Sequence, residues 1–282
     1  MQKLAIYQSL WAMERRHPDQ VEYSVDESFD MIVEAGFSGV CLDLGADEIA
    51  EFTGFKPLFE TRGLTCMVNA FPGKVADMQP LLGMAGDFGA TLVNVIGGVM
   101  PVTVAGAIPV IYRWMEEAEK CDLPLLFETH RDGMLNDLYY TLQVIDSVPE
   151  MRLCADLSHF VVDREFRIPL PEVDRGYITR ILERSDCFQG RVASREQVQI
   201  QIDFPQHAQW VEVFKSWWKE GMRMWRSRNA DDATLIFLCE LGPPPYAMTD
   251  ANQLELSDRW TEGLAIKTWV EQIWAELEQE QT

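Results

Sequence analysis

The sequence predicts one (β/α)₈ barrel domain with eight parallel strands, covering residues 1–282. Short runs rich in Val, Ile, Leu, Phe and Cys recur along the chain, and helical apolar spacing follows each of them. The runs lack the alternation of strands with one exposed face, which indicates a parallel sheet covered on both faces. A chain of 282 residues is of ordinary length for one closed barrel, and no linker is evident.

The predicted elements alternate regularly. The strands are Leu4–Leu10, Gly39–Leu44, Leu64–Ala70, Thr91–Ile96, Leu123–His130, Met151–His159, Cys187–Ala193 and Thr234–Leu241. The clearest helix covers Ser24–Ala35, with Ser24 placed to cap it. Further helices begin near Ala46, Val75, Val102, Leu135, Pro171, His207 and Leu254. Eight βα repeats fit a closed barrel better than an open doubly wound sheet.

Charge and hydropathy exclude several classes of function. The formal net charge is −21 and the pI is about 4.5, so the chain repels phosphate backbones and is not expected to bind nucleic acid. No apolar run reaches the roughly 18 residues of a membrane span, and the N-terminus lacks the features of a secretory signal. We therefore expect a soluble, cytoplasmic protein without a membrane partner.

The six cysteines agree with a reducing compartment. They stand at positions 41, 66, 121, 154, 187 and 239, with no C-x-x-C pair. Five of them lie inside predicted strands, where a reduced thiol behaves as a small hydrophobe. Neither a disulfide framework nor a zinc cluster follows from this spacing.

Two further segments bear on the pocket and on assembly. The stiff loop Gly242–Ser257 follows the last strand and is expected to wall the pocket at the active-site end of the barrel. The helix from His207 carries tryptophans at positions 210, 217, 218 and 225. We expect them to pack against the barrel, with an aromatic interface of a homo-oligomer as the alternative.

Three predicted strands carry an acid at or near the end of their apolar runs, namely Glu128, Asp156 and Glu240. A carboxylate at the tip of a buried strand is costly unless a cation or hydrogen-bond donors meet it. A lone acid of this kind would more simply cap a helix or pair with an arginine, but three at corresponding positions predict one shared ion. On the seventh strand, either Gln189 or Arg191 points inward at the same height.

With these residues in view, the chain resembles the xylose-isomerase-like barrel superfamily over essentially its whole length. This superfamily includes ketose 3-epimerases, inosose-processing enzymes, sugar-phosphate isomerase/epimerase relatives and apurinic endonucleases. The matching pieces are the E-x-H of Glu128 and His130, the D-x-x-H of Asp156 and His159, Arg191, and the terminal Glu240. The resemblance implies one divalent ion, held by Glu128, Asp156, the strand-seven residue and Glu240, with the two glutamates also acting as acid and base.

One position departs from the family pattern, because Gln189 stands where family members usually have His. A Gln amide oxygen can also bind a metal, and the resulting all-oxygen ligand set suits Mn²⁺ or Mg²⁺ better than Zn²⁺. Co²⁺ and Zn²⁺ are the alternatives, and weaker affinity is the expected cost. If Gln189 instead disables the site, the protein is a sugar-binding barrel or an inactive variant.

The expected chemistry is proton transfer next to a carbonyl group. A divalent ion that binds a carbonyl oxygen and its neighbouring hydroxyl acidifies the intervening C–H and stabilises an enediolate. In this hypothesis Glu128 and Glu240 move the proton, and Asp156 is only a ligand. The expected substrate is a small polyhydroxy ketone or sugar, with or without a phosphate. The residues assigned to contact it are His130, His159, Arg191 and Arg195; His130 is equally consistent with a buried core residue.

Two other activities are alternatives to isomerisation or epimerisation. If the β-carbon carries a leaving group, the same intermediate expels it, and the protein is a lyase acting on an inosose or a 3-keto-glycoside. An endonuclease is disfavoured, because a multi-metal cluster needs more ligands than the four histidines of this acidic chain provide.

Overall fold

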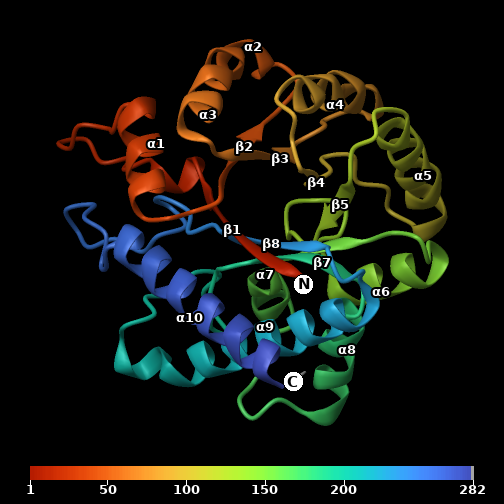
Figure 1. Cartoon of the computed structure of the whole chain (residues 1–282). Coiled ribbons are helices and arrows are strands. Elements are labelled where there is room, and N and C mark those ends of the chain that lie inside the picture. Colours follow the sequence, from red (N-terminus) through yellow and green to blue (C-terminus); the bar gives the residue numbers. More distant parts are fainter. Residues whose placement is uncertain (281–282) are drawn as a thin grey trace.

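The computed structural model describes residues 1–280, in which eight parallel strands close into a barrel in the order β1 to β8 (Figure 1). The predicted fold class is therefore confirmed. The strands are β1 Lys3–Ser9, β2 Gly39–Leu44, β3 Thr65–Ala70, β4 Leu92–Val95, β5 Leu125–Glu128, β6 Leu153–Ala155, β7 Ser185–Gln189 and β8 Thr234–Cys239. The barrel closes where β1 pairs with β8, from Lys3 opposite Thr234 to Gln8 opposite Cys239.

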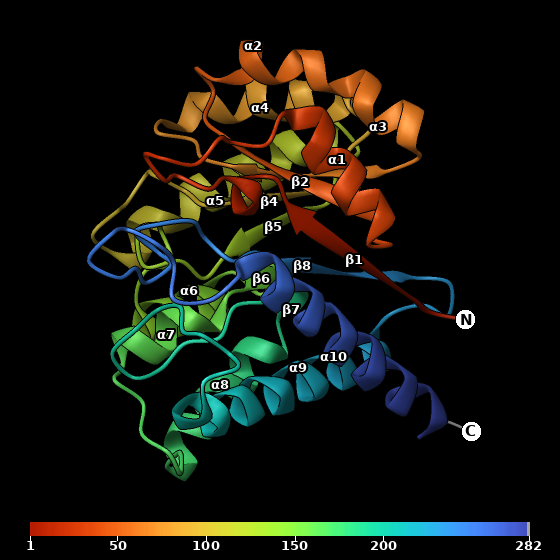
Figure 2. The same ribbon diagram turned by 90° about the vertical axis from the view of Figure 1, so that its left-hand side faces the viewer.

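Helices surround the barrel and connect successive strands (Figures 1 and 2). They are α1 Val25–Glu34, α2 Ile49–Phe52, α3 Lys56–Arg62, α4 Met78–Asp87, α5 Val104–Lys120, α6 Leu138–Ser147, α7 Leu157–Asp163, α8 Glu172–Leu182, α9 Ala208–Arg228 and α10 Arg259–Gln279. Figure 2 shows both ends of the described chain at the end of the barrel where β1 begins. Loops surround the opposite end of the barrel, where the strands end.

Local sequence explains how α1 begins. The Ser24 hydroxyl accepts a hydrogen bond from the Glu27 backbone N–H, and the Glu27 carboxylate accepts one from the Ser24 N–H. This reciprocal capping box satisfies two backbone donors that the first helical turn leaves free. The helix then turns Phe29 and Ile32 into the core, where both side chains are fully buried.

The interior of the barrel is filled by side chains that form their own apolar cluster. Its buried members are Tyr7, Cys41, Met67, Leu92, Leu126, Cys154, Cys187, Ile236 and Leu238. All six cysteines of the described chain are free thiols, and Cys121 is the exposed one. A second and larger cluster fills the space between the strands and the helices.

Two predicted strand ends need correction. The prediction carried the sixth strand to His159, whereas β6 ends at Ala155 and α7 begins at Leu157. The cause is Asp156, whose Oδ1 accepts a hydrogen bond from the Ser158 N–H at 2.9 Å and so starts a helix. The seventh strand was carried to Ala193, but β7 ends at Gln189.

The aromatic face of α9 packs mainly inward. Trp217, Trp218 and Trp225 are buried against the barrel and against α10, and Trp210 is partly buried. Packing against the barrel therefore explains most of this face. Among residues 1–280, no helix combines the length and the apolar character needed to cross a membrane.

Candidate active site

A ring of polar side chains surrounds the mouth of the barrel, with one contributed by each described strand or by the residue that follows it. Its members are Ser9, Asp43, Asn69, Asn94, Glu128, Asp156, Gln189 and Glu240. Asp43 is half-buried and the other seven are buried. Buried polar groups are costly unless they are partnered, so this ring must be held together by hydrogen bonds or by a bound ion.

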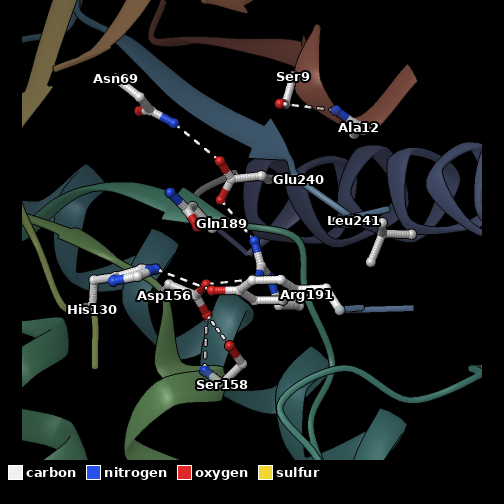
Figure 3. Close-up of polar contacts among 12 residues, drawn as sticks. Ser9, Ala12, Asn69, His130, Asp156, Ser158, Gln189, Arg191, Glu240 and Leu241 are labelled. Carbon is white, nitrogen blue, oxygen red and sulfur yellow. Dashed lines mark hydrogen bonds and ion pairs between the residues drawn. The ribbon is translucent and has the colours of Figure 1, made fainter. Parts of the chain in front are cut away.

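Two asparagines connect the acids on one half of the ring. The Asn69 amide donates hydrogen bonds to Asp43 Oδ1 at 2.7 Å and to Glu240 Oε1 at 3.0 Å (Figure 3). The Asn94 amide donates to Asn69 Oδ1 at 2.8 Å and to Glu128 Oε2 at 2.5 Å. These bonds fix the orientation of both glutamates that the sequence singled out.

The three predicted strand-end acids converge. One oxygen atom each from Glu128, Asp156 and Glu240 lies within 4.8 Å of the others, and all three residues are buried. The Gln189 amide joins them by donating to Glu128 Oε2 at 2.7 Å. These carboxylates could therefore hold a metal ion.

Unpaired oxygen atoms support the fit of a hard cation to this site. Among the described residues, Glu128 Oε1 and Gln189 Oε1 are buried without a hydrogen-bond partner, and Asp156 Oδ2 has only two long contacts, 3.3 Å to His159 Nε2 and 3.4 Å to Arg191 Nε. A buried acceptor without a donor is destabilising, and a divalent cation would satisfy all three. The donor set is made entirely of oxygen, as Mg²⁺ and Mn²⁺ prefer.

Arg191 brings a positive charge into the same cluster. Its side chain is almost fully buried, its Nη2 donates to Glu240 Oε2 at 2.9 Å, and its Nε lies 3.4 Å from Asp156 Oδ2 (Figure 3). The guanidinium carbon also lies 4.7 Å from the centre of the Tyr246 ring. Both strand-seven candidates thus face the site, Gln189 toward Glu128 and Arg191 toward the other two acids.

The surroundings shift the pKa values of the three acids in different directions. Burial, reinforced by the charge of Asp156, raises the pKa of Glu128 to about 8. Burial, reinforced by Glu128, raises the pKa of Glu240 well above its ordinary value. Burial also acts on Asp156, but His159 and Arg191 outweigh it and hold the pKa of this carboxyl below its usual range. Burial therefore favours the neutral form of the two glutamates, whereas His159 and Arg191 favour the ionised form of Asp156.

The rings of His130 and His159 lie beside the acids, with centres 4.1 Å apart and planes tilted by 56°. His130 Nδ1 accepts a hydrogen bond from the Asp132 N–H at 3.1 Å, so the proton of the neutral ring sits on Nε2, 3.3 Å from the Tyr246 hydroxyl. Burial lowers the pKa of His130 to about 2, which keeps the ring neutral. Glu128, His130 and His159 also lie at metal-binding distances, but this tautomer leaves His130 no free lone pair for an ion.

His159 lies in the first turn of α7 rather than on a strand. Its Nε2 is 3.3 Å from Asp156 Oδ2, and its side chain is fully buried. Burial lowers its pKa, against the pull of the Asp156 charge. The ring is therefore placed to orient Asp156 rather than to bind an ion directly.

A cavity of about 270 Å³ lies on the ring. Its walls combine the apolar side chains Trp11, Phe71, Ile96 and Tyr246 with the polar side chains Asp43, Glu128, His130, Arg191 and Glu240. Tyr246 comes from the loop after β8, as predicted for a wall of the pocket. The volume is at the low end for small-molecule sites, which suits a compact ligand.

Sequence reasoning missed four members of the ring, Ser9, Asp43, Asn69 and Asn94. Each is a polar residue near the end of a predicted strand, which is the signal that identified Glu128, Asp156 and Glu240. Arg195, assigned to substrate contact, does not line the cavity, and its Nη2 pairs instead with Glu165 Oε2 at 2.6 Å.

No protein-family model matches the sequence, and no curated protein matches it. Solved structures do resemble the fold. A xylose isomerase-like TIM barrel protein from Mycobacterium smegmatis in complex with magnesium is 15% identical, with a TM-score of 0.63 and coverage of 97% of each chain. The D-allulose 3-epimerase of a Methylomonas species is 12% identical, with a TM-score of 0.62 and coverage of 96% of this chain and 98% of that one.

An L-ribulose 3-epimerase is also 12% identical, with a TM-score of 0.59 and coverage of 98% of this chain and 96% of that chain. At such identities the likeness concerns the fold. The chain therefore has the fold of the xylose isomerase-like TIM barrels and ketose 3-epimerases over nearly its full length, which confirms the resemblance seen in its motifs.

Proposed function

We propose that the protein is a divalent-metal-dependent isomerase or epimerase of a small polyhydroxy ketone. The observation that carries the proposal is the convergence of three buried carboxylates beside a small cavity, with one oxygen of Glu128 lacking a hydrogen-bond partner. Solved structures with this fold include ketose 3-epimerases and a magnesium complex, which supports the same class of reaction.

The ion would be held by Glu128, Asp156, Gln189 and Glu240, and Mn²⁺ or Mg²⁺ suits these oxygens best. When bound, it supplies a positive charge that polarises the substrate carbonyl. The chain's own groups supply the proton transfer. Glu128 and Glu240 reach the cavity from β5 and β8, so they approach a bound substrate from different strands.

In the proposed reaction, one glutamate takes the proton from the carbon next to the carbonyl, which leaves an enediolate. The other glutamate returns a proton to that carbon or to its neighbour. Each carboxyl has a raised pKa in the metal-free site because of burial, and a nearby cation would lower it toward the range useful for acid and base catalysis. Asp156 stays ionised throughout.

The apolar wall has a separate role in this proposal. Trp11 and Tyr246 meet edge to face, with ring centres 5.3 Å apart. Their rings would cover the C–H face of a sugar and exclude water from the reactive intermediate.

Exchange of solvent deuterium tests the proposal directly. The Mn²⁺-loaded protein is incubated in D₂O with a panel of ketoses, and incorporation next to the carbonyl is followed by NMR. We expect incorporation that EDTA stops and that Glu128→Gln and Glu240→Gln abolish. Glu165→Gln, at an exposed position, serves as the matched control. If folded, metal-loaded protein exchanges no proton across the panel, the proposal is wrong, whereas loss of a leaving group would identify a lyase.

A further inference from the structure

Arg191 forms ion pairs with two acids of the carboxylate cluster, Asp156 and Glu240. Its Nη2 is 2.9 Å from Glu240 Oε2 and its Nε is 3.4 Å from Asp156 Oδ2. Arg191 and Asp156 are each about 1% exposed or less, and Glu240 is 4% exposed. This ion pair therefore lies inside the barrel mouth, where water screens charges far less than at a surface.

The backbone fixes the position from which Arg191 enters the site. The Gly190 N–H donates to the Leu238 carbonyl of β8 at 2.6 Å. A Cβ atom at Gly190 would lie 2.8 Å from both Ile266 Cγ2 and Phe237 Cε1, so no side chain fits there without a shift. Arg191 thus follows a closely packed glycine, and its guanidinium is directed at the acids by the barrel wall itself.

The hydrogen bonds divide the four proposed metal ligands into two groups. In the part of the chain that the structure describes, Glu128 and Gln189 each keep one buried oxygen without a hydrogen-bond partner, and Asp156 Oδ2 has only its long contacts to Arg191 and His159. Both oxygens of Glu240 are engaged, Oε1 by the Asn69 amide and Oε2 by Arg191. The guanidinium therefore satisfies the one acid that has no oxygen to spare.

A divalent ion and this guanidinium would stand next to each other as like charges. An ion that contacted both Asp156 and Glu240 would meet Arg191 at the same oxygen atoms. Two positive charges at contact distance repel each other strongly in a buried site, where water screens them little. The two cations would therefore compete for the same oxygen atoms.

We propose that Arg191 is an intramolecular competitor for the divalent ion, so that the ion gains Asp156 and Glu240 only when the guanidinium leaves them. The inference rests on the proposed function in that it concerns the same ion. A released guanidinium has a place to go, because it already lies 4.7 Å from the centre of the Tyr246 ring and 5.9 Å from that of Trp11, both of which line the cavity.

Mn²⁺ titration of the metal-free protein, followed by calorimetry or by the EPR signal of free Mn²⁺, tests the competition without any substrate. We expect Arg191→Met to bind Mn²⁺ about tenfold more tightly than the wild type, or better. Arg195→Met is the matched control, because it removes an arginine four residues further on whose partner is Glu165, and it should leave the affinity unchanged.

A second substitution examines Glu240. Glu240→Gln should lower Mn²⁺ affinity more in the Arg191→Met background than in the wild type. In Arg191→Met the Glu240 carboxylate is free to bind the ion, whereas in the wild type Arg191 already occupies it. Unchanged or weaker Mn²⁺ binding by folded Arg191→Met overturns the inference, as does equal loss from Glu240→Gln in both backgrounds.

Crystals of the wild type grown with Mn²⁺ provide a test that does not depend on the folding of a variant. We expect any ion that contacts Asp156 and Glu240 to be accompanied by an Arg191 side chain that has left both. An ion at these acids with the arginine pairs intact contradicts the inference.

The outcomes separate this inference from the proposed function. Tighter Mn²⁺ binding by Arg191→Met without deuterium exchange in any variant supports the competition and rejects the reaction. Deuterium exchange by the wild type, together with an Mn²⁺ affinity of Arg191→Met equal to that of the wild type, supports the reaction and rejects the competition. If neither protein binds Mn²⁺, both proposals are wrong.

Discussion

Gln189 shows how a single side chain sets the character of the site. Its amide donates to Glu128 Oε2 at 2.7 Å, so the donor group is used within the protein and the amide oxygen remains for an ion. A neutral amide oxygen is a weaker ligand than an imidazole nitrogen for most first-row divalent metals. If Gln189 binds an ion, the chain combines a weak ligand at this position with a guanidinium two residues later.

Replacing Gln189 by His should strengthen metal binding. We expect Gln189→His to bind Zn²⁺ and Mn²⁺ about tenfold more tightly, with the larger gain for Zn²⁺, because imidazole suits zinc. Competitive titration with a coloured chelator measures both affinities. Gln199→His, in which the replaced amide bonds the backbone of Gly242 rather than the ring, is the control. Equal affinities for the wild type and Gln189→His would show that position 189 is not a ligand.

Asn94 is expected to contribute to stability through its two hydrogen bonds, to Asn69 and Glu128. Asn94→Leu leaves the buried Asn69 Oδ1 without its donor and Glu128 Oε2 with the Gln189 amide alone, so the free energy of unfolding should fall by about 1–3 kcal/mol. Urea denaturation measures the change. The exposed Asn252→Leu should alter stability by less than about 0.5 kcal/mol. An equally small change in the free energy of unfolding for Asn94→Leu would mean that other donors replace the Asn94 amide in the ring.

The residues of the site could be predicted from sequence only in part. Glu128, Asp156 and Glu240 were found because acids at the ends of apolar strands are conspicuous. Arg191 was expected to point inward as an alternative to Gln189, whereas both face the site. Alternation places positions 189 and 191 on the same face, so the two residues need not be alternatives. Because β7 ends at Gln189, the direction of Arg191 also depends on the turn that follows.

At the scale of elements, the strands were predictable and their ends were not. Continuous apolar runs identified all of the described strands, because parallel strands buried on both faces tolerate few polar residues. The junction of β6 and α7 was mistaken because Asp156 is both the end of an apolar run and the N-cap of the next helix. Sequence periodicity alone does not distinguish these roles over three or four residues.

The first turn of α10 contains a buried acid with a measurable effect on stability. Glu262 accepts a hydrogen bond from the Ile202 N–H at 2.9 Å, and burial raises its pKa to about 7. Between the unfolded value of about 4.5 and this folded value, the native state holds a proton that the unfolded chain has lost. The free energy of unfolding should therefore fall as the pH rises through this window, by up to about 3 kcal/mol.

Denaturation of the Glu262→Gln variant across pH 4.5 to 7 checks this expectation, since Gln keeps the acceptor and removes the titration. Its stability should vary less with pH than that of the wild type. Glu276→Gln, at an exposed position of the same helix, should retain the wild-type slope. If the free energy of unfolding varies with pH equally in the wild type and in Glu262→Gln, Glu262 does not cause the pH dependence.

At the scale of the whole molecule, the net charge of −21 opposes the folded state through self-repulsion. Screening at moderate salt should relieve it, because the Debye length falls to about 10 Å at 0.1 M ionic strength. We expect the melting temperature to rise between about 0.02 M and 0.3 M NaCl. Differential scanning fluorimetry in NaCl and in matched sucrose separates screening from preferential exclusion. A falling melting temperature in NaCl would show that attractive ion pairs dominate.

The presence of Arg191 among the rim acids also has a consequence for how the protein matures. A barrel whose buried acids had no internal counter-charge would close against their mutual repulsion until an ion arrived. Here a newly synthesised chain carries that counter-charge in its own sequence, from a segment that packs directly on β8. Closure of the metal-free barrel is therefore expected to meet less repulsion among these acids than it would without Arg191.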